Sequence, residues 1–114
     1  MNKTIRSALE ETFPDLDNYK TEIDITDKFF KDRGISDDKL DQVFWNHMIS
    51  LWERIDKNEQ NDLEIENMEE FSKEAKNLLE EYILEVSKHR NFEINNFEKM
   101  LVAIYMQRMQ EEEK

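Results

Sequence analysis

The chain has 114 residues, of which 38% are hydrophobic and 39% charged, and it contains one glycine, one proline and no cysteine. So few turn-forming residues exclude a sandwich or barrel, which needs a turn about every 8–12 residues, while abundant Glu, Lys, Leu and Met favour helices. The net charge of −12 argues against contacts with nucleic acid or an anionic membrane surface, and a chain without cysteine has no disulfide or thiolate metal site.

Two helices are predicted in the first third of the chain. Apolar residues recur every four positions over residues 3–12, and this helix is expected to end before Pro14, because a residue that precedes proline avoids the α region. A second helix is predicted over residues 19–33. Gly34 follows it, at the position where a helix C-terminus favours a left-handed residue.

The clearest helical pattern follows Ser36, which is the expected N-cap of a third helix that runs to about Lys57. Trp45 and Ile49 lie off the main apolar stripe of this helix, so it is expected either to be buried on two sides or to contact another subunit. The stripe itself recurs at intervals of three and four residues and comprises Leu40, Val43, Phe44, His47, Met48, Leu51, Trp52 and Ile55.

The last part of the chain predicts two or three further helices. Residues 65–86 form one helix or two helices with a bend near Phe71. Asn95, followed three residues later by Glu98, resembles a capping box at the start of the last helix. Residues 111–114 are expected to form a frayed tail. The core face of the last helix is expected to comprise Phe97, Leu101, Ile104 and Tyr105.

These five or six helices each carry an apolar face and are joined by short loops. The simplest arrangement is an all-α, compact bundle around one core, with residues 1–114 forming a single domain. The N-terminus lacks the apolar stretch of a signal peptide, and no run approaches the roughly 18 apolar residues of a membrane span. We therefore expect a cytoplasmic protein. One glycine cannot build a Gly-rich phosphate loop, and no cofactor is expected.

The two histidines are the first candidates for chemistry. His47 lies on the apolar stripe of the third helix, and Arg54 follows seven residues later on nearly the same face. A phosphoryl group or carboxylate held between them is chemically reasonable, because guanidinium groups pair well with oxyanions. The alternative is a core histidine with both ring nitrogens bonded to the protein, whereas a ring open to a cleft would favour the reactive role. His89 is expected in an exposed loop.

Acidic pairs raise a different interpretation, metal-dependent hydrolysis. Glu66 and Glu69 have an ExxE spacing, and Glu53 and Asp56 have an ExxD spacing. Helical nucleotide pyrophosphohydrolases hold Mg²⁺ with such pairs, but in that family the ExxE pair comes first, and here the order is reversed. Among 28 acidic residues such spacings arise by chance. We therefore expect no metal site and no enzymatic activity.

The residues around His47 suggest a family. The run LDQVFWNHMISLWER, from Leu40 to Arg54, resembles the signature helix of PTS regulation domains, in which a histidine is followed seven residues later by the arginine of a Glu-Arg pair. The stretch from Phe71 to Val86 looks like the central helix of that family. The stretch from Phe92 to Glu98 resembles the acidic approach to its last helix. The resemblance spans about residues 20–108.

The resemblance implies a five-helix, usually dimeric module that responds to sugar supply in bacterial antiterminators and activators. It further implies that His47 is a phosphoacceptor. Arg54 would pair with the phosphoryl oxygens, and His89 is kept as a secondary candidate. The implied partners are a phosphocarrier protein or a sugar-permease B component of the phosphotransferase system, a second copy of the chain, and a transcriptional regulator.

The chain departs from the family pattern in two ways. A second family histidine is expected about seven residues after Glu98, where Tyr105 stands. No RNA-binding or helix-turn-helix domain is attached, so we expect a stand-alone module that acts on a partner protein. The alternative is a constitutive helical dimer or adaptor in which His47 is structural and is not phosphorylated.

Overall fold

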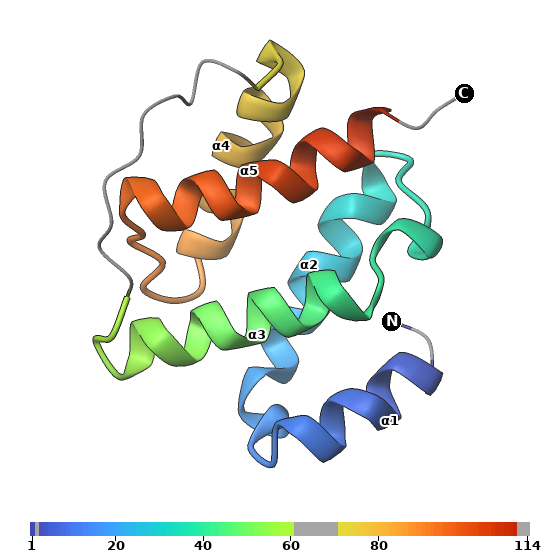
Figure 1. Ribbon diagram of the computed structural model, residues 1–114, viewed down its shortest axis with the longest axis vertical. Coiled ribbons are helices and arrows are strands. Elements are labelled where there is room, and N and C mark those ends of the chain that lie inside the picture. Colours follow the sequence, from blue (N-terminus) through green and yellow to red (C-terminus); the bar gives the residue numbers. More distant parts are fainter. Residues whose placement is uncertain (2, 61–70, 112–114) are drawn as a thin grey trace.

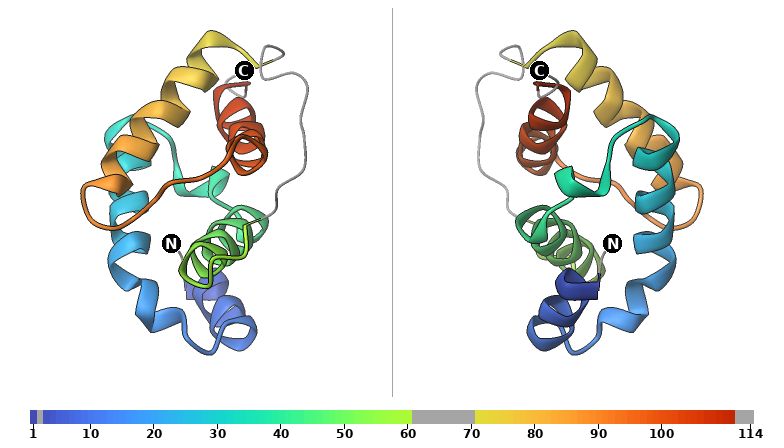
Figure 2. Two further views of the ribbon diagram at one scale, coloured as in Figure 1. Left: turned by 90° about the vertical axis from the view of Figure 1, so that its left-hand side faces the viewer. Right: turned by 90° about the vertical axis from the view of Figure 1, so that its right-hand side faces the viewer.

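The helices of this computed structural model form two layers (Figures 1 and 2). The structure describes residues 1, 3–60 and 71–111. One layer contains α1 (Lys3–Thr12), α3 (Gln42–Asp56) and α5 (Asn96–Glu111), and the other contains α2 (Lys20–Asp32) and α4 (Lys73–Ser87). Two short 3₁₀ turns, η1 (Leu16–Tyr19) and η2 (Asp37–Lys39), lead into α2 and towards α3.

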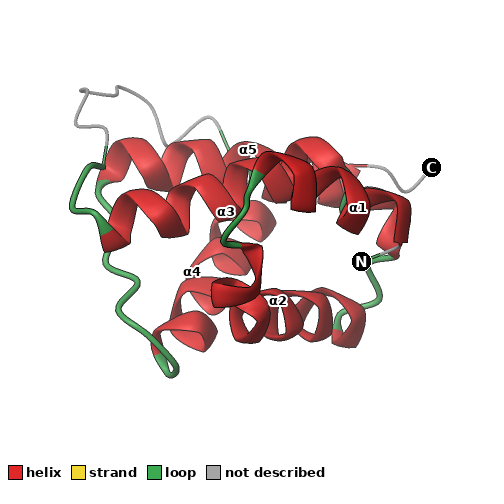
Figure 3. Ribbon diagram, turned by 90° about the horizontal axis from the view of Figure 1, so that it is seen from below, coloured by secondary structure: helices red, strands yellow, loops and turns green. Residues whose placement is uncertain are grey.

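Contacts within and between the layers join helices that are not all neighbours in the sequence. α3 lies in the middle of its layer, with α1 on one side and α5 on the other, while α4 packs on both α2 and α5 (Figure 2). Figure 3 shows the two layers one above the other. The described residues thus form five α-helices and no strand, which confirms the predicted all-α bundle. Among these helices, none combines the length and the apolar character that crossing a bilayer requires.

The first two helices end where local sequence signals place their ends. α1 ends at Thr12, two residues before Pro14. After α2, Gly34 adopts a left-handed conformation with φ of 77°. The Gly34 N–H donates to the Lys31 carbonyl, and the Ile35 N–H donates to the Phe30 carbonyl, each at 3.0 Å. This pair of bonds is a Schellman motif, which satisfies the last carbonyls of the helix.

The predicted start of the third helix is wrong. Ser36 precedes the 3₁₀ turn η2, and its side chain makes no capping hydrogen bond. Leu40 then leaves the helical region, so the α-helix starts only at Gln42. Asp41 is the actual N-cap, and its Oδ1 accepts a hydrogen bond from the Phe44 N–H at 3.0 Å.

Of the two arrangements predicted for residues 65–86, the unbroken helix is wrong, because the chain bends at Phe71. α4 starts at Lys73, and the Ser72 hydroxyl caps it by accepting the Ala75 N–H at 3.0 Å. Phe71 precedes the helix, and the earlier part of the predicted region, residues 65–70, lies outside the described residues. At the other end of the chain, Glu111 still belongs to α5, and residues 112–114 lie outside the described residues.

α3 is the central helix of the core and is buried on two sides. Trp45 and Ile49, which lie off the predicted stripe, are fully buried, so the choice left open by the sequence is resolved in favour of burial. Val43 was expected in the core but is 58% exposed. The buried residues of α3 surround most of the helix because it contacts neighbours on both sides and the layer beneath: Phe44, Trp45, Met48, Ile49, Leu51, Trp52 and Ile55.

The predicted core face of α5 is also wrong. Ile104 is 42% exposed, and Phe97, Leu101 and Tyr105 are only half-buried. The helix is apolar on two faces, and packing against α4 selects the face that the sequence analysis did not choose. The buried apolar residues of α5 are Val102, Ala103, Met106 and Met109.

Arg90, in the connection between α4 and α5, ties the two layers together. Its guanidinium donates to Glu22 of α2 at 3.0 Å and also to Asp56 at the end of α3. Tyr19 donates to the other oxygen of the same Asp56 carboxylate at 2.8 Å. Because the Arg90 and Glu22 side chains are mostly buried, this bridge is less screened by solvent than a surface ion pair.

Replacement of Arg90 tests this bridge. We expect Arg90→Ala to lower the free energy of unfolding by about 1–3 kcal/mol, since it leaves the mostly buried Glu22 carboxylate without its cation. Arg90→Lys should lie between the variant and the wild type, because an ammonium group cannot bond both acids in the same fork. Urea unfolding at neutral pH measures both.

The matched control is Lys28→Ala, which removes an exposed ion pair with Asp32 on the surface of α2. It should cost less than about 0.5 kcal/mol. An Arg90→Ala protein that unfolds at the same urea concentration as the Lys28→Ala protein would contradict the role of the bridge.

Candidate functional site

The antiparallel pairing of α3 and α5 creates the candidate site (Figure 1). His47 and Arg54 lie seven residues apart on α3, and Glu98 and Tyr105 lie seven residues apart on α5. The pairing places His47 against Tyr105 and Arg54 against Glu98. We refer to these four side chains as the His47 cluster.

Arg54 and Glu98 form a bidentate ion pair. Arg54 Nε donates to Glu98 Oε2 at 3.1 Å, and an Arg54 terminal nitrogen donates to Glu98 Oε1 at 2.9 Å. Glu98 is fully buried, whereas Arg54 keeps part of its surface in solvent. A planar guanidinium matches the two oxygens of a carboxylate, so this contact is both strong and geometrically restrictive.

The start of α5 holds Glu98 in position through its own hydrogen bonds. Asn95 Oδ1 accepts the Glu98 N–H at 2.9 Å, which is the Asn95 half of the capping box predicted from the sequence. The Asn95 N–H in turn donates to the side-chain oxygen of Gln60 at 3.1 Å, and the Gln60 amide donates to the Glu93 carbonyl at 2.9 Å. The chain after α3 and the chain before α5 are thereby joined beside the ion pair.

The His47 ring is half-buried and packs against Tyr105, with 5.3 Å between ring centroids. Its Nε2 is enclosed by protein and has no hydrogen-bond partner among the described residues. Burial lowers the pKa of His47, Arg54 lowers it further, and Glu98 opposes the shift. The imidazole is therefore neutral at pH 7 and keeps the lone pair that a nucleophile requires. Neither alternative describes this ring. Its Nε2 has no partner among the described residues, so the two nitrogens are not both bonded, and Nε2 is enclosed by protein and does not open to a cleft.

Tyr105 connects the His47 cluster to the other end of the helix pair. Its ring also packs edge-on against Phe44, with 5.7 Å between centroids. One turn further along α5, Arg108 pairs with Asp41, the N-cap of α3, at 3.3 Å. α3 and α5 are therefore joined by an ion pair near each end and by aromatic contacts between them.

His89 lies apart from the His47 cluster. It is exposed in the connection after α4, at the rim of a hollow of about 430 Å³ between α2 and α4. Ile25 and Phe29 form part of this hollow, and Glu85 lies on its edge. The structure does not bring the two histidines together.

The acidic pairs do not form a visible metal site. Glu66 and Glu69 lie outside the described residues. Asp56 is engaged by Tyr19 and Arg90. Within residues 1, 3–60 and 71–111, no three acidic or histidine side chains are placed to share a metal ion.

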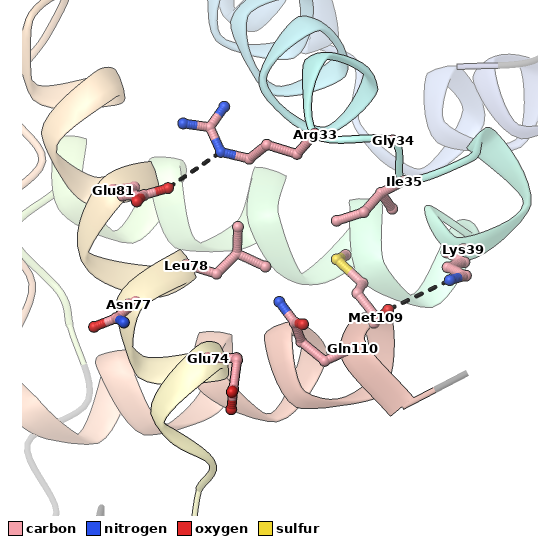
Figure 4. Close-up of a pocket in the computed structure, with 10 residues that line it drawn as sticks. All are labelled: Arg33, Gly34, Ile35, Lys39, Glu74, Asn77, Leu78, Glu81, Met109 and Gln110. Carbon is pink, nitrogen blue, oxygen red and sulfur yellow. Dashed lines mark hydrogen bonds and ion pairs between the residues drawn. The ribbon is translucent and has the colours of Figure 1, made fainter. Parts of the chain in front are cut away.

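A second hollow, of about 500 Å³, lies between the end of α2, α4 and the end of α5 (Figure 4). Its two basic residues are already bonded: Arg33 donates to Glu81 at 3.2 Å, and Lys39 donates to the Met109 carbonyl at 3.3 Å. Apolar residues, acidic residues and the two amides of Asn77 and Gln110 line most of the remainder. His47 and Arg54 do not line this hollow.

Sequence reasoning found half of the cluster. It selected His47 and Arg54 but treated Glu98 as a capping residue and Tyr105 as a core residue. A signal for the missing half was present, because the seven-residue spacing from His47 to Arg54 recurs from Glu98 to Tyr105. Two helices with equal spacings can align both pairs when they pack antiparallel.

Comparisons of the chain with protein-family models, with curated proteins and with solved structures found no match. The resemblance to PTS regulation domains therefore stays a prediction drawn from the residues themselves. The geometry of the His47 cluster is the main support for any proposal about function.

The titration of His47 tests the electrostatics of the cluster. We expect an NMR titration of its ring to give a midpoint below the ordinary 6.5. Arg54→Gln should raise the midpoint, and Glu98→Gln should lower it further. With Arg54→Gln the midpoint should still stay below 6.5, because burial is the largest cause of the shift.

The same shift predicts how stability depends on pH. The folded chain binds a proton at His47 less readily than the unfolded chain, so the contribution of His47 is complete above pH 6.5 and is lost as the pH falls through the folded-state pKa. His47→Gln should therefore flatten the fall in urea midpoint below pH 6.5. A His47 ring that titrates above 6.5 would contradict the burial seen here.

Proposed function

We propose that the protein is a non-catalytic regulatory module in which His47 accepts a phosphoryl group from a protein of the phosphotransferase system. The observation that carries this proposal is a half-buried imidazole that packs against Tyr105 and lies on the same face of α3 as Arg54, two helical turns away. The neutral ring supplies the attacking lone pair. Arg54 supplies a positive charge for the phosphoryl oxygens.

The bonds that form and break in the transfer involve one atom of this chain, the acceptor nitrogen of His47. The lone pair of the imidazole nitrogen attacks phosphorus, and an N–P bond forms as the bond between phosphorus and the donor side chain breaks. The donor keeps the electron pair of the broken bond. The product adds about −1.5 to −2 charges to a chain that already carries −12, so phosphorylation would change which surfaces this protein can approach.

The second candidate function is that of a constitutive helical adaptor. The observation that favours it is the bidentate pairing of Arg54 with Glu98, which engages the arginine before any phosphoryl group arrives. Tyr105 also stands where the family pattern has its second histidine. In this case the His47 ring serves to pack α3 against α5.

A homodimer through the outer face of α5 fits both functions. Phe97, Leu101 and Ile104 leave apolar surface on that side, and exposed Val43 lies on the neighbouring helix. From residue 97 to residue 108 the sequence contains one acid, Glu98, and it is buried. Two copies that each carry −12 would meet there with little acid-to-acid repulsion, and His47 borders this face through Tyr105.

Enzymatic labelling tests the acceptor. The chain is incubated with phosphoenolpyruvate, enzyme I and the phosphocarrier protein, and its intact mass is measured before and after acid treatment. We expect one acid-labile phosphoryl group in the wild type and in His89→Gln, and none in His47→Gln.

A reference PTS regulation domain is labelled in parallel, and a permease B component is tested as an alternative donor. No label on this chain, with the reference domain labelled and both donors active, would favour the adaptor. A label that persists in His47→Gln and disappears in His89→Gln would show that His89, and not His47, is the phosphoacceptor.

The dimer is tested by placing a charge on the proposed contact. We expect sedimentation equilibrium to show a dimer for the wild type and a monomer for Ile104→Glu, since the buried contact would then contain two unpaired carboxylates. Leu84→Glu is the control, because Leu84 is also an exposed apolar residue, at 65% against 42% for Ile104, but lies on α4, in the other layer. Equal association of the two variants would contradict this interface.

A further inference from the structure

Arg54 stands between two acceptors that would compete for it after phosphorylation. Its Nε and one terminal nitrogen are bonded to the buried carboxylate of Glu98. His47 lies two helical turns before Arg54 on the face of α3 that meets α5, where its ring packs against Tyr105 and Arg54 pairs with Glu98. A phosphoryl group added to the ring would therefore be attracted to the Arg54 guanidinium, which is already bonded to Glu98. It would be repelled by the negative charge of the Glu98 carboxylate.

We propose that phosphorylation of His47 draws Arg54 away from Glu98 and releases the first turn of α5. The proposal rests on the acceptor role given to His47 above and extends it by naming the response. Arg54 links the two events because it changes partner from Glu98 to the phosphoryl group. The start of α5 is the segment that moves.

The charges decide the direction of this exchange. A phosphoryl group carries close to two negative charges and three acceptor oxygens, whereas the Glu98 carboxylate carries one charge and two oxygens. Guanidinium binds both in the same forked geometry, and the larger charge of the phosphoryl group attracts it more strongly. The fully buried Glu98 then loses the guanidinium that offsets its lost hydration, and opening of its turn of the helix lets water reach the carboxylate.

The opening is confined to one end of α5 by the contacts at the other end. The first turn depends on Asn95, which caps Glu98 and accepts the Lys99 N–H at 2.9 Å. The last turns are held independently, because Arg108 pairs with Asp41 and the Met109 carbonyl accepts from Lys39. The expected motion is therefore a local loss of helix around residues 96–101, beside the apolar face that we propose for dimerisation.

Hydrogen exchange after chemical phosphorylation tests the release without any protein donor. In a His89→Gln background, phosphoramidate is used to modify His47. The imidazole lone pair attacks phosphorus, the P–N bond of the reagent breaks, and its nitrogen leaves as ammonia after taking up a proton. We expect the amides of Glu98 and Lys99 to exchange roughly tenfold faster, while the amides of residues 105–109 keep their rates.

Glu98→Gln in the same background is the matched control. The glutamine side chain is uncharged, so loss of Arg54 leaves no buried charge at position 98. Phosphorylation should then no longer accelerate exchange of the backbone amides at the start of α5. An equal acceleration with glutamine at position 98, or no acceleration with His47 fully phosphorylated, would overturn the proposal.

His47→Glu provides a second route that needs no reagent to reach the ring. Its carboxylate should compete for Arg54, and exchange at Glu98 and Lys99 should accelerate, again only when Glu98 is intact. If the Glu98 and Lys99 amides exchange at unchanged rates in this variant and in the phosphorylated protein, phosphorylation does not release the start of α5. This conclusion holds even if the phosphotransferase proteins label His47. If enzymatic labelling fails but exchange is accelerated, the phosphotransferase proteins are not the donors. The coupling between His47 and the start of α5 is then still supported.

Discussion

The fully buried carboxylate of Glu98 is the constraint on which the α3–α5 pair depends. A carboxylate removed from water persists only where a cation and hydrogen-bond donors replace the lost solvation. Arg54 meets this need with two hydrogen bonds, whose geometry allows little displacement of one helix along the other. Removing one partner from such a pair typically costs about 3–5 kcal/mol, a large part of the stability of a small domain.

The remaining architecture keeps this contact in place. α3 has α1 and α5 at its sides and the other layer beneath it, which explains why it is buried over most of its surface. Arg90 repeats the same physical solution between the layers, with one guanidinium serving Glu22 and Asp56. In both places a mostly buried arginine joins elements that are distant in the sequence, so electrostatic contacts determine how apolar helices are oriented.

The charge distribution explains why the outer face of α5 and His47 belong to one functional proposal. Acidic side chains cover much of a chain whose net charge is −12, but the exposed part of α5 between residues 97 and 108 carries none. His47 lies at the edge of this face, neutral and in contact with Tyr105. A negative charge added to the His47 ring would therefore affect two things together: the packing of α3 against α5 and the electrostatic potential of the outer face of α5.

The sequence by itself determined the properties that depend on neighbouring residues. The all-α class, the ends of helices at Pro14, Gly34 and Asn95, and the shared face of His47 and Arg54 follow from local geometry, and the structure confirms them. The displaced start of α3 and the buried face of α5 were missed, because short 3₁₀ turns and two-sided apolar helices satisfy more than one local pattern. Only the tertiary structure decided that Arg54 meets a buried glutamate, since the pairing of two helices depends on how the whole core packs and not on the spacing within either helix.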